Sequence, residues 1–250
     1  MAEKDENDPN YWINMAYTLT TQNRPDSAIK YYEKALELDP DNVVALGNLG
    51  NIYSQKGDFV NAKKYLEYVT RRYPDLVEGW INLGVQYGEE GNQLDKEIKC
   101  FEKALELDPS RPQIWRNIGN IYRTKKMYPE AKPYYEESLR LRPDHIDTLY
   151  DKANVHFNLN ETDDAEKCYD KILELDPNHP DANSDKGAVL CKKEMYADGI
   201  PFFDRALKTH DASVKTKIRT LRNKAIALRK LGESGDAFKC EEEADTLEFQ

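Results

Sequence analysis

The chain has 250 residues, of which 33% are charged and 39% hydrophobic, and its formal net charge is −10. This acidic balance argues against a nucleic-acid-binding protein, because phosphate recognition needs a dominant basic face. No apolar run approaches the roughly 20 residues that a membrane-spanning helix needs, and the polar start of the chain shows no secretory signal, so we expect a cytoplasmic protein that contacts no membrane.

A ten-residue segment recurs along the chain at an almost constant interval. It reads YYEKALELDP at 31–40, and related segments close with prolines at steps of 34, 35, 34 and 34 residues. A period in this range is typical of a stacked repeat array, in which each unit contacts mainly its neighbours. We therefore expect a disordered leader at 1–8 and a single solenoid at 9–250, with repeats at about 9–42, 43–76, 77–111, 112–145, 146–179, 180–213 and 214–250.

Each repeat is expected to form two helices. In the first repeat Trp12, Ala16 and Leu19 lie on one helical face, and Pro40 ends the second helix because proline cannot continue it. The first helices of the next repeats carry the same residue types in register: Leu46, Leu49, Gly50 and Tyr53; Trp80, Leu83, Gly84 and Tyr87; Trp115, Ile118, Gly119 and Tyr122. A small residue at the Gly position lets the paired helices approach closely. In repeat six Gly199 replaces the alanine of the second helix, which puts close packing of that repeat in question.

This arrangement resembles the tetratricopeptide repeat, which has Trp, Leu-Gly and Tyr on its first helix and Ala, an aromatic residue, Ala and Pro on its second. The clearest match is WINLGVQY at 80–87, and the resemblance extends over about 9–250. It implies an all-α, right-handed superhelical solenoid of helix-turn-helix repeats whose first helices line a concave groove. It also implies that the partner is another protein or a peptide.

Polar residues recur on the face of the first helices that does not take part in helix packing. The residue before the Leu of Leu-Gly forms one row, Asn14, Asn48, Asn82, Asn117, Asp151, Asp185 and Asn223, and a second row contains Asn51, Asn120 and Asn154. An amide offers both a donor and an acceptor, so such a ladder can pair with the backbone of an extended peptide whatever its sequence. The tetratricopeptide domain of O-GlcNAc transferase carries a similar ladder. The alternative is that Asn is common at this repeat position and faces solvent.

Arg116 and Asn120 partly match the two-carboxylate clamp with which one subclass of tetratricopeptide domains binds the carboxyl tails of heat-shock chaperones. The following first helices supply Asp151, Asp181 and Asp185 in place of the Asn, Lys and Arg residues that the clamp needs. These carboxylates would repel a carboxylate ligand. We therefore expect no chaperone-tail clamp, and Arg116 is kept as a groove residue.

Four carboxylates recur at equivalent places of repeats five and six: Asp147, Asp151, Asp181 and Asp185. Residues four apart share a helix face, so they should form an acidic patch where Lys or Arg of a partner docks. The alternative is internal neutralisation by the next helix, where Arg219 stands at the position equivalent to Asp181. A divalent metal is a weaker interpretation because nothing fixes a ligand cage. The basic stretch from Arg205 to Lys230 suits a solvated face, a contact for an acidic tail or an RNA-contacting patch.

No motif of catalysis stands in the chain: there is no phosphate-binding loop, no HExxH and no GxSxG. The four cysteines form no CxxC pair and fit a reducing compartment. We predict no enzyme, no catalytic residue, no metal and no cofactor. The main hypothesis is an interaction scaffold that holds an extended or helical segment of a partner in its groove. Two alternatives stay open: a self-assembling homo-oligomeric scaffold, and the repeat segment of a larger enzyme or signalling protein.

Overall fold

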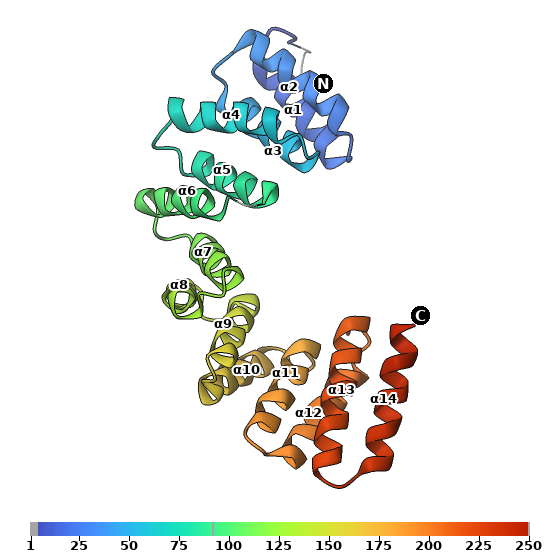
Figure 1. The fold of residues 1–250 in the computed structure, drawn as a ribbon. Coiled ribbons are helices and arrows are strands. Elements are labelled where there is room, and N and C mark those ends of the chain that lie inside the picture. Colours follow the sequence, from blue (N-terminus) through green and yellow to red (C-terminus); the bar gives the residue numbers. More distant parts are fainter. Residues whose placement is uncertain (1–4, 92, 250) are drawn as a thin grey trace. The chain divides into compact units, whose positions relative to one another are not determined.

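The computed structural model describes residues 5–91 and 93–249, and every regular element within them is a helix. These helices, shown in Figure 1, are α1 (Pro9–Thr21), α2 (Pro25–Leu38), α3 (Val43–Gln55), α4 (Phe59–Arg72), α5 (Val77–Glu90), α6 (Leu94–Leu107), α7 (Pro112–Thr124), α8 (Tyr128–Leu141), α9 (Ile146–Asn158), α10 (Thr162–Leu175), α11 (Pro180–Lys192), α12 (Tyr196–Lys208), α13 (Val214–Lys230) and α14 (Ser234–Glu248). The expected all-α class is confirmed. No helix in the described ranges combines the length and the apolar character that crossing a membrane requires.

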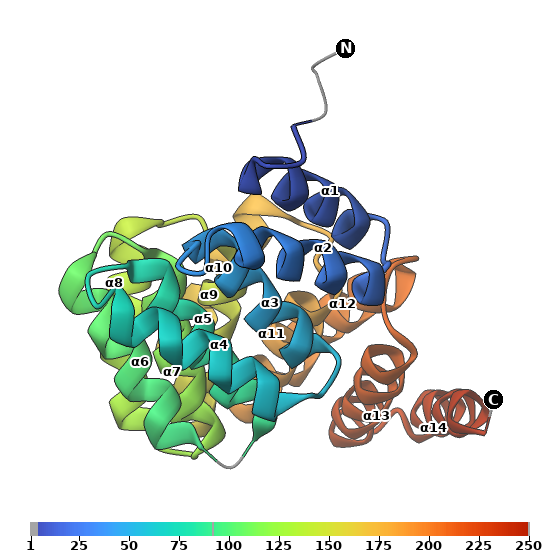
Figure 2. The same cartoon turned by 90° about the horizontal axis from the view of Figure 1, so that it is seen from above.

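The chain divides into two compact units, Met1–Ile114 and Trp115–Gln250. In the first unit α1 pairs with α2, α3 with α4 and α5 with α6, and α3 also touches α5. In the second unit α9 pairs with α10, α11 with α12 and α13 with α14, and α11 also touches α13. Figures 1 and 2 both show α13 and α14 lying side by side. Each pair corresponds to one repeat of the sequence, whereas the single continuous solenoid over 9–250 stays a prediction.

The ends of the helices follow from local chemistry. Asp8, Asn42 and Asp58 precede helices, and their side-chain oxygens accept hydrogen bonds from backbone N–H groups of the first turn, which those N–H groups otherwise lack. Each turn between the two helices of a repeat has, among its described residues, one with a positive φ angle: Asn23, Gly57, Gly91, Lys126, Asn160, Glu194 and Gly232. The expected leader is described only from residue 5 onward. There, Trp12 donates its Nε1–H to the Glu6 carbonyl at 2.9 Å.

Close packing inside the repeats depends on the recurring small residues. A Cβ atom at Gly50 would lie 2.5 Å from the Leu66 side chain, and one at Gly119 would lie 2.9 Å from the Tyr135 ring. Most of the largest fully buried side chains come from the second helices: Tyr32, Leu66, Phe101, Tyr135, Tyr169 and Phe203. Packing is also close in repeat six, because a Cβ atom at the buried Gly199 would lie 3.0 Å from the Gly187 carbonyl oxygen. The glycine therefore tightens this repeat rather than loosening it.

Candidate functional site

A cleft lies in the first unit between the first helices of repeats two and three, α3 and α5. Its larger part is a hollow of about 400 Å³ lined by Val43, Val44, Gly47, Asn48, Asn51, Leu66, Val69, Leu76, Glu78, Gly79 and Asn82. Its smaller part is a hollow of about 200 Å³ lined by Asn51, Ser54, Gln55, Asn82, Val85, Gln86 and Glu89. Asn51 and Asn82 line both hollows, so the two form one cleft with an apolar end and a polar end. We call it the α3–α5 cleft.

Glycine at position 47 leaves room for this cleft. The nearest atom to a Cβ placed on Gly47 is the Asn82 amide nitrogen at 3.9 Å, an ordinary contact distance. No neighbour therefore requires a glycine here, although glycine inside a helix costs about 1 kcal/mol relative to alanine. Gly79 differs, since a Cβ there would meet Val69 at 3.0 Å. What Gly47 provides is open space in front of Asn82.

Three predicted ladder residues, Asn48, Asn51 and Asn82, are brought together in the cleft. All three are half-buried. Within the described part of the chain no side-chain hydrogen bond engages them, whereas polar groups that a fold shields from water normally have a partner. Their amides are therefore free to bind a ligand.

The polar end of the cleft contains a buried amide with an unpartnered oxygen. Gln86 is 1% exposed, and its Nε2 donates to the Glu90 carboxylate at 3.4 Å. Because a carboxylate only accepts hydrogen bonds, this contact fixes which way the amide faces. The Gln86 Oε1 has no hydrogen-bond donor among the described residues. Next to it, the Ser54 hydroxyl donates to Glu89.

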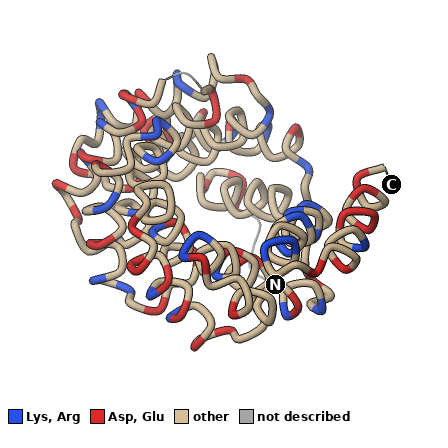
Figure 3. The backbone as a smooth tube through the Cα atoms, turned by 60° about the horizontal axis from the view of Figure 1, so that its bottom comes forward, with Lys and Arg blue, Asp and Glu red and all other residues tan. Residues whose placement is uncertain are grey.

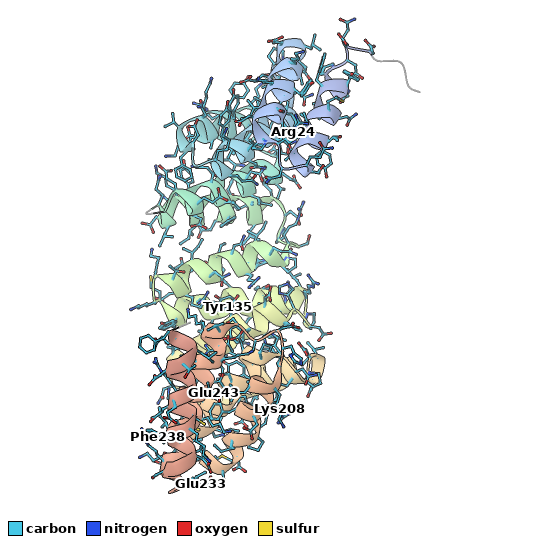
Figure 4. All side chains as sticks on the ribbon, turned by 90° about the vertical axis from the view of Figure 1, so that its right-hand side faces the viewer. Arg24, Tyr135, Lys208, Glu233, Phe238 and Glu243 are labelled. Carbon is cyan, nitrogen blue, oxygen red and sulfur yellow. The ribbon has the colours of Figure 1, made fainter. Side chains whose placement is uncertain are left out.

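The remaining predicted groove residues have different surroundings. Asn14 is exposed on α1, and Asn117 is half-buried on α7. The other two have a structural partner: Asn120 accepts a hydrogen bond from the buried Tyr135 hydroxyl at 2.7 Å, and Asn154 accepts one from the buried Tyr169 hydroxyl at 3.1 Å. Figure 4 marks Tyr135 on its helix. In these two repeats the second Asn row supports the packing of the second helix.

The four acidic-patch residues are all in contact with arginines of the second unit. Arg116 contacts Asp151 at 2.8 Å and Asp147 at 3.2 Å. Arg219 contacts Asp181 at 3.0 Å and Asp185 at 3.2 Å. Both arginines come from the first helix of a neighbouring repeat. The geometry therefore supplies the internal neutralisation that the sequence left as an alternative to docking.

Asp185 is held from two sides. The Tyr150 hydroxyl donates to it at 2.6 Å, and Arg219 reaches it from α13. Burial raises the pKa of Asp185 although Arg219 acts in the opposite direction. Burial also raises the pKa of Tyr150, and the neighbouring Asp185 charge adds to the effect.

Part of the basic stretch is paired as well. Arg222 donates to Glu248 at 2.5 Å, Lys224 to Asp204 at 2.6 Å and Arg229 to Glu241 at 2.5 Å. The carboxylates belong to α12 and α14, and Figure 3 shows Asp and Glu recurring along the C-terminal helix. Part of the positive charge between Arg205 and Lys230 is thus compensated inside the second unit.

One cluster in the described residues has the composition of a metal site. His156, Glu161 and Asp164 place one candidate ligand atom each within 4.8 Å of one another. These groups already interact: His156 Nδ1 and Glu161 lie 2.6 Å apart, Lys132 contacts Glu161 at 2.8 Å, and Lys167 contacts Asp164 at 2.9 Å. A metal ion would have to displace two ammonium groups, so the cluster is accounted for by ion pairs.

The sequence did not identify four further residues of the cleft: Gly47, Ser54, Gln86 and Glu89. Gln86 did carry a signal, because it stands where the neighbouring repeats have Ile52 and Ile121. Those two isoleucines are buried, so a glutamine in their place is a polar residue at an interior position. Gly47 also differs from its equivalents, since the residue before the ladder position is Arg116 in repeat four and Tyr150 in repeat five.

Family models described as tetratricopeptide repeat match residues 9–42, 31–64, 77–111 and 122–189, and the chain belongs to this family. The human Protein O-mannosyl-transferase TMTC3 is 31% identical over 134 residues, which are 54% of this chain and 15% of the relative. The Anaphase-promoting complex subunit CDC16 of Saccharomyces cerevisiae is 28% identical over 140 residues, 53% of this chain and 16% of the relative. The chain thus spans less than a fifth of the length of these two relatives.

Solved structures show the same fold. A tetratricopeptide repeat protein from Parabacteroides merdae has a TM-score of 0.69 and 14% identity, covering 96% of this chain and 93% of its own. YrrB, described as a tetratricopeptide repeat protein with an unusual peptide-binding site, has a TM-score of 0.60 and 21% identity, covering 73% of this chain and 91% of its own. At this identity the likeness concerns the fold alone. The fold is that of a protein-interaction scaffold.

Proposed function

We propose that this chain is a protein-binding module whose α3–α5 cleft holds an extended segment of a partner protein. The observation that carries the proposal is the grouping of Asn48, Asn51 and Asn82 around one hollow, with their amides unused by the fold. An extended peptide presents alternating N–H and C=O groups, and each amide can pair with both kinds. The peptide-binding site named for YrrB is consistent with this use of the fold.

The proposal concerns binding only, and it leaves room for the longer proteins that contain such repeats. TMTC3 and CDC16 are a named transferase and a named subunit of a complex, and the matching part is a small share of each. A repeat module within such a chain would position a partner without taking part in chemistry. The same cleft would serve a free-standing protein equally well.

The test compares three versions of the full 250-residue chain as bait in the lysate of the source cell. The triple variant Asn48→Ala, Asn51→Ala and Asn82→Ala should bind its partner at least tenfold more weakly, because each lost hydrogen bond costs about 0.5–1.5 kcal/mol. Its thermal midpoint should stay close to that of the wild type, since these side chains bind nothing within the described fold. A control with the exposed Gln22→Ala and Gln113→Ala removes amides elsewhere and should retain the partner. A partner held equally by all three versions would contradict the proposal.

A further inference from the structure

The polar end of the α3–α5 cleft contains acceptors but no cation. Glu89 accepts from the Ser54 hydroxyl, and within the described residues no Lys or Arg forms an ion pair with it. The adjacent Glu90 provides the contrast, because Lys63 contacts it at 2.6 Å. One of two consecutive carboxylates is therefore neutralised by the fold, and the other lies at the cleft without a counterion.

A second acceptor belongs to Gln86, which lines the same hollow. The Gln86 Oε1 is buried and has no donor among the described residues. A buried carbonyl without a donor destabilises the folded state, and a ligand donor that hydrogen-bonds to it would remove this penalty. Asn51 and Asn82 line the same hollow and can each present a carbonyl oxygen. The group that satisfies a carboxylate and several carbonyls at once is a cation with several N–H donors.

The other end of the cleft has the opposite chemistry. Val43, Val44, Leu66, Val69 and Leu76 line the larger hollow, which suits an aliphatic side chain. Gly47 marks this end on α3 and Ser54 marks the polar end, and seven residues of helix correspond to about 10 Å along the axis. An extended peptide covers that distance in about three residues.

We propose that the segment bound in the α3–α5 cleft carries an arginine two or three positions from an aliphatic residue, with the guanidinium placed between Glu89 and Gln86. The arginine fork offers five N–H donors in one plane, more than the lysine ammonium group offers. Asn48, Asn51 and Asn82 pair with the backbone between the two anchors. This assignment rests on the proposed function and adds the chemistry of the ligand to it.

The experiment selects random dodecapeptides displayed on phage against the 250-residue chain and then measures synthetic versions of the enriched peptides by calorimetry. Enriched sequences are expected to share an aliphatic residue and an arginine at the stated spacing. Replacing that arginine by citrulline, which keeps the shape and loses the charge, should weaken binding by about tenfold or more, because hydrogen bonds to charged groups are the stronger ones. Glu89→Gln should weaken the arginine peptide to a similar degree and leave the citrulline peptide nearly unchanged. It should also reduce the salt dependence of binding.

Two control variants keep the interpretation clear. Glu102→Gln makes the same charge change at an exposed position of α6 that lines neither hollow, and it should bind like the wild type. Gln86→Leu places an apolar residue where the neighbouring repeats have isoleucine. It should raise the urea midpoint of unfolding while weakening the arginine peptide several-fold.

The outcomes separate the two proposals. Enriched peptides that depend on Asn48, Asn51 and Asn82 but show no basic residue, or bind equally to the Glu89→Gln variant, would overturn the arginine assignment and leave peptide binding in place. Lysine peptides that bind more tightly than arginine peptides would overturn the choice of arginine. Peptides that bind independently of the three asparagines, or a library without any enrichment, would overturn both proposals.

Discussion

The first helices of the two units use the same repeat position in opposite ways. In the first unit Gly47 faces Asn82, and the space between them is open. In the second unit the equivalent residues are larger and paired: Arg116 contacts Asp151 at 2.8 Å, and Tyr150 donates to Asp185 at 2.6 Å. In each case the two positions are 35 residues apart, one in each of two successive repeats. One geometry thus gives an open polar cleft in one unit and a network of ion pairs and hydrogen bonds in the other.

This difference separates polar residues that serve the fold from those that are left for a ligand. Buried polar groups normally find a partner within the protein, as Arg116, Arg219 and Tyr150 do in the second unit, where the buried Asn183 Oδ1 and Arg123 Nε are exceptions with no partner among the described residues. The α3–α5 cleft departs from it at Gln86, whose buried oxygen lacks a donor. Stability and binding should therefore respond to mutation in opposite ways in the two units.

Asp151→Ala should lower the free energy of unfolding by about 2–3 kcal/mol, less than the roughly 3–5 kcal/mol of a fully buried pair, because it leaves two partly exposed arginines without their carboxylate. Asp151 is 7% exposed and contacts both Arg116 and Arg123. The matched change at the equivalent position of the first unit, Asn82→Ala, should alter stability by less than about 0.5 kcal/mol. Urea denaturation followed by circular dichroism measures both. Equal losses for the two variants would contradict the comparison.

Asn120→Ala should cost about 1–2 kcal/mol of stability, since it leaves the buried Tyr135 hydroxyl without its acceptor at 2.7 Å. Asn51 stands at the same position of repeat two, where the second helix supplies Leu66 in place of a tyrosine. Asn51→Ala should therefore be nearly neutral for stability. The double variant Asn120→Ala with Tyr135→Phe should recover part of the loss. A thermal melt of the four proteins tests this, and a large effect of Asn51→Ala would contradict it.

Glu97 of the first unit is a carboxylate without the arginine partners found in the second. Burial raises its pKa from 4.5 to about 7, and its carboxylate lies against Gly88 of α5. A carboxyl group whose pKa is higher in the folded state binds protons more tightly there. The wild type should therefore lose stability as the pH rises from about 4.5 to 7, and the deficit should persist above pH 7.

Glu97→Gln removes this dependence and should stabilise the chain by about 1–2 kcal/mol at pH 8. A tenfold change in a protonation constant corresponds to about 1.4 kcal/mol, and partial exposure of the side chain reduces the full effect. The gain should be smaller at pH 5, where Glu97 is already protonated in the folded protein. Urea midpoints at the two pH values give the comparison, with Glu102→Gln as the exposed control. A gain that is the same at pH 5 and pH 8 would exclude titration of Glu97 as its cause.

The paired arrangement of the second unit can be transferred to the first with Gly47→Arg and Asn82→Asp. Together they should stabilise the chain by about 1 kcal/mol, because arginine is a better helix former than glycine and a partly exposed ion pair adds a few tenths. The double variant should also lose peptide binding, since the arginine fills the space in front of position 82. A double-mutant cycle measures the coupling. Retained peptide affinity would show that the cleft is not the binding site.

The helical pairs were predictable because their sequence signals are local. Pro40 ends a helix wherever it stands, and the alternation of large and small residues around Gly50 and Gly119 defines a helical face from the sequence alone. The Asn row was visible for the same reason. The sequence did not predict that these asparagines fall into two groups. Asn120 and Asn154 accept hydrogen bonds from tyrosine hydroxyls, whereas Asn48 and Asn82 have no side-chain hydrogen bond within the described fold. That division depends on which residue the second helix, or the next repeat, places opposite each asparagine.

By itself the sequence determined the family, the helical class and the polar positions that recur on the first helices. These follow from a period repeated over several units. Tertiary structure decided which polar side chains have a hydrogen-bond or ion-pair partner within the protein. Arg116 lies beside Asp151 because two successive first helices pack in register, whereas Gly47 at the equivalent place leaves Asn82 without a partner. A side chain's hydrogen-bond partners are set by distance in space. Only the packed structure shows which asparagines have a partner inside the protein and which line the cleft without one.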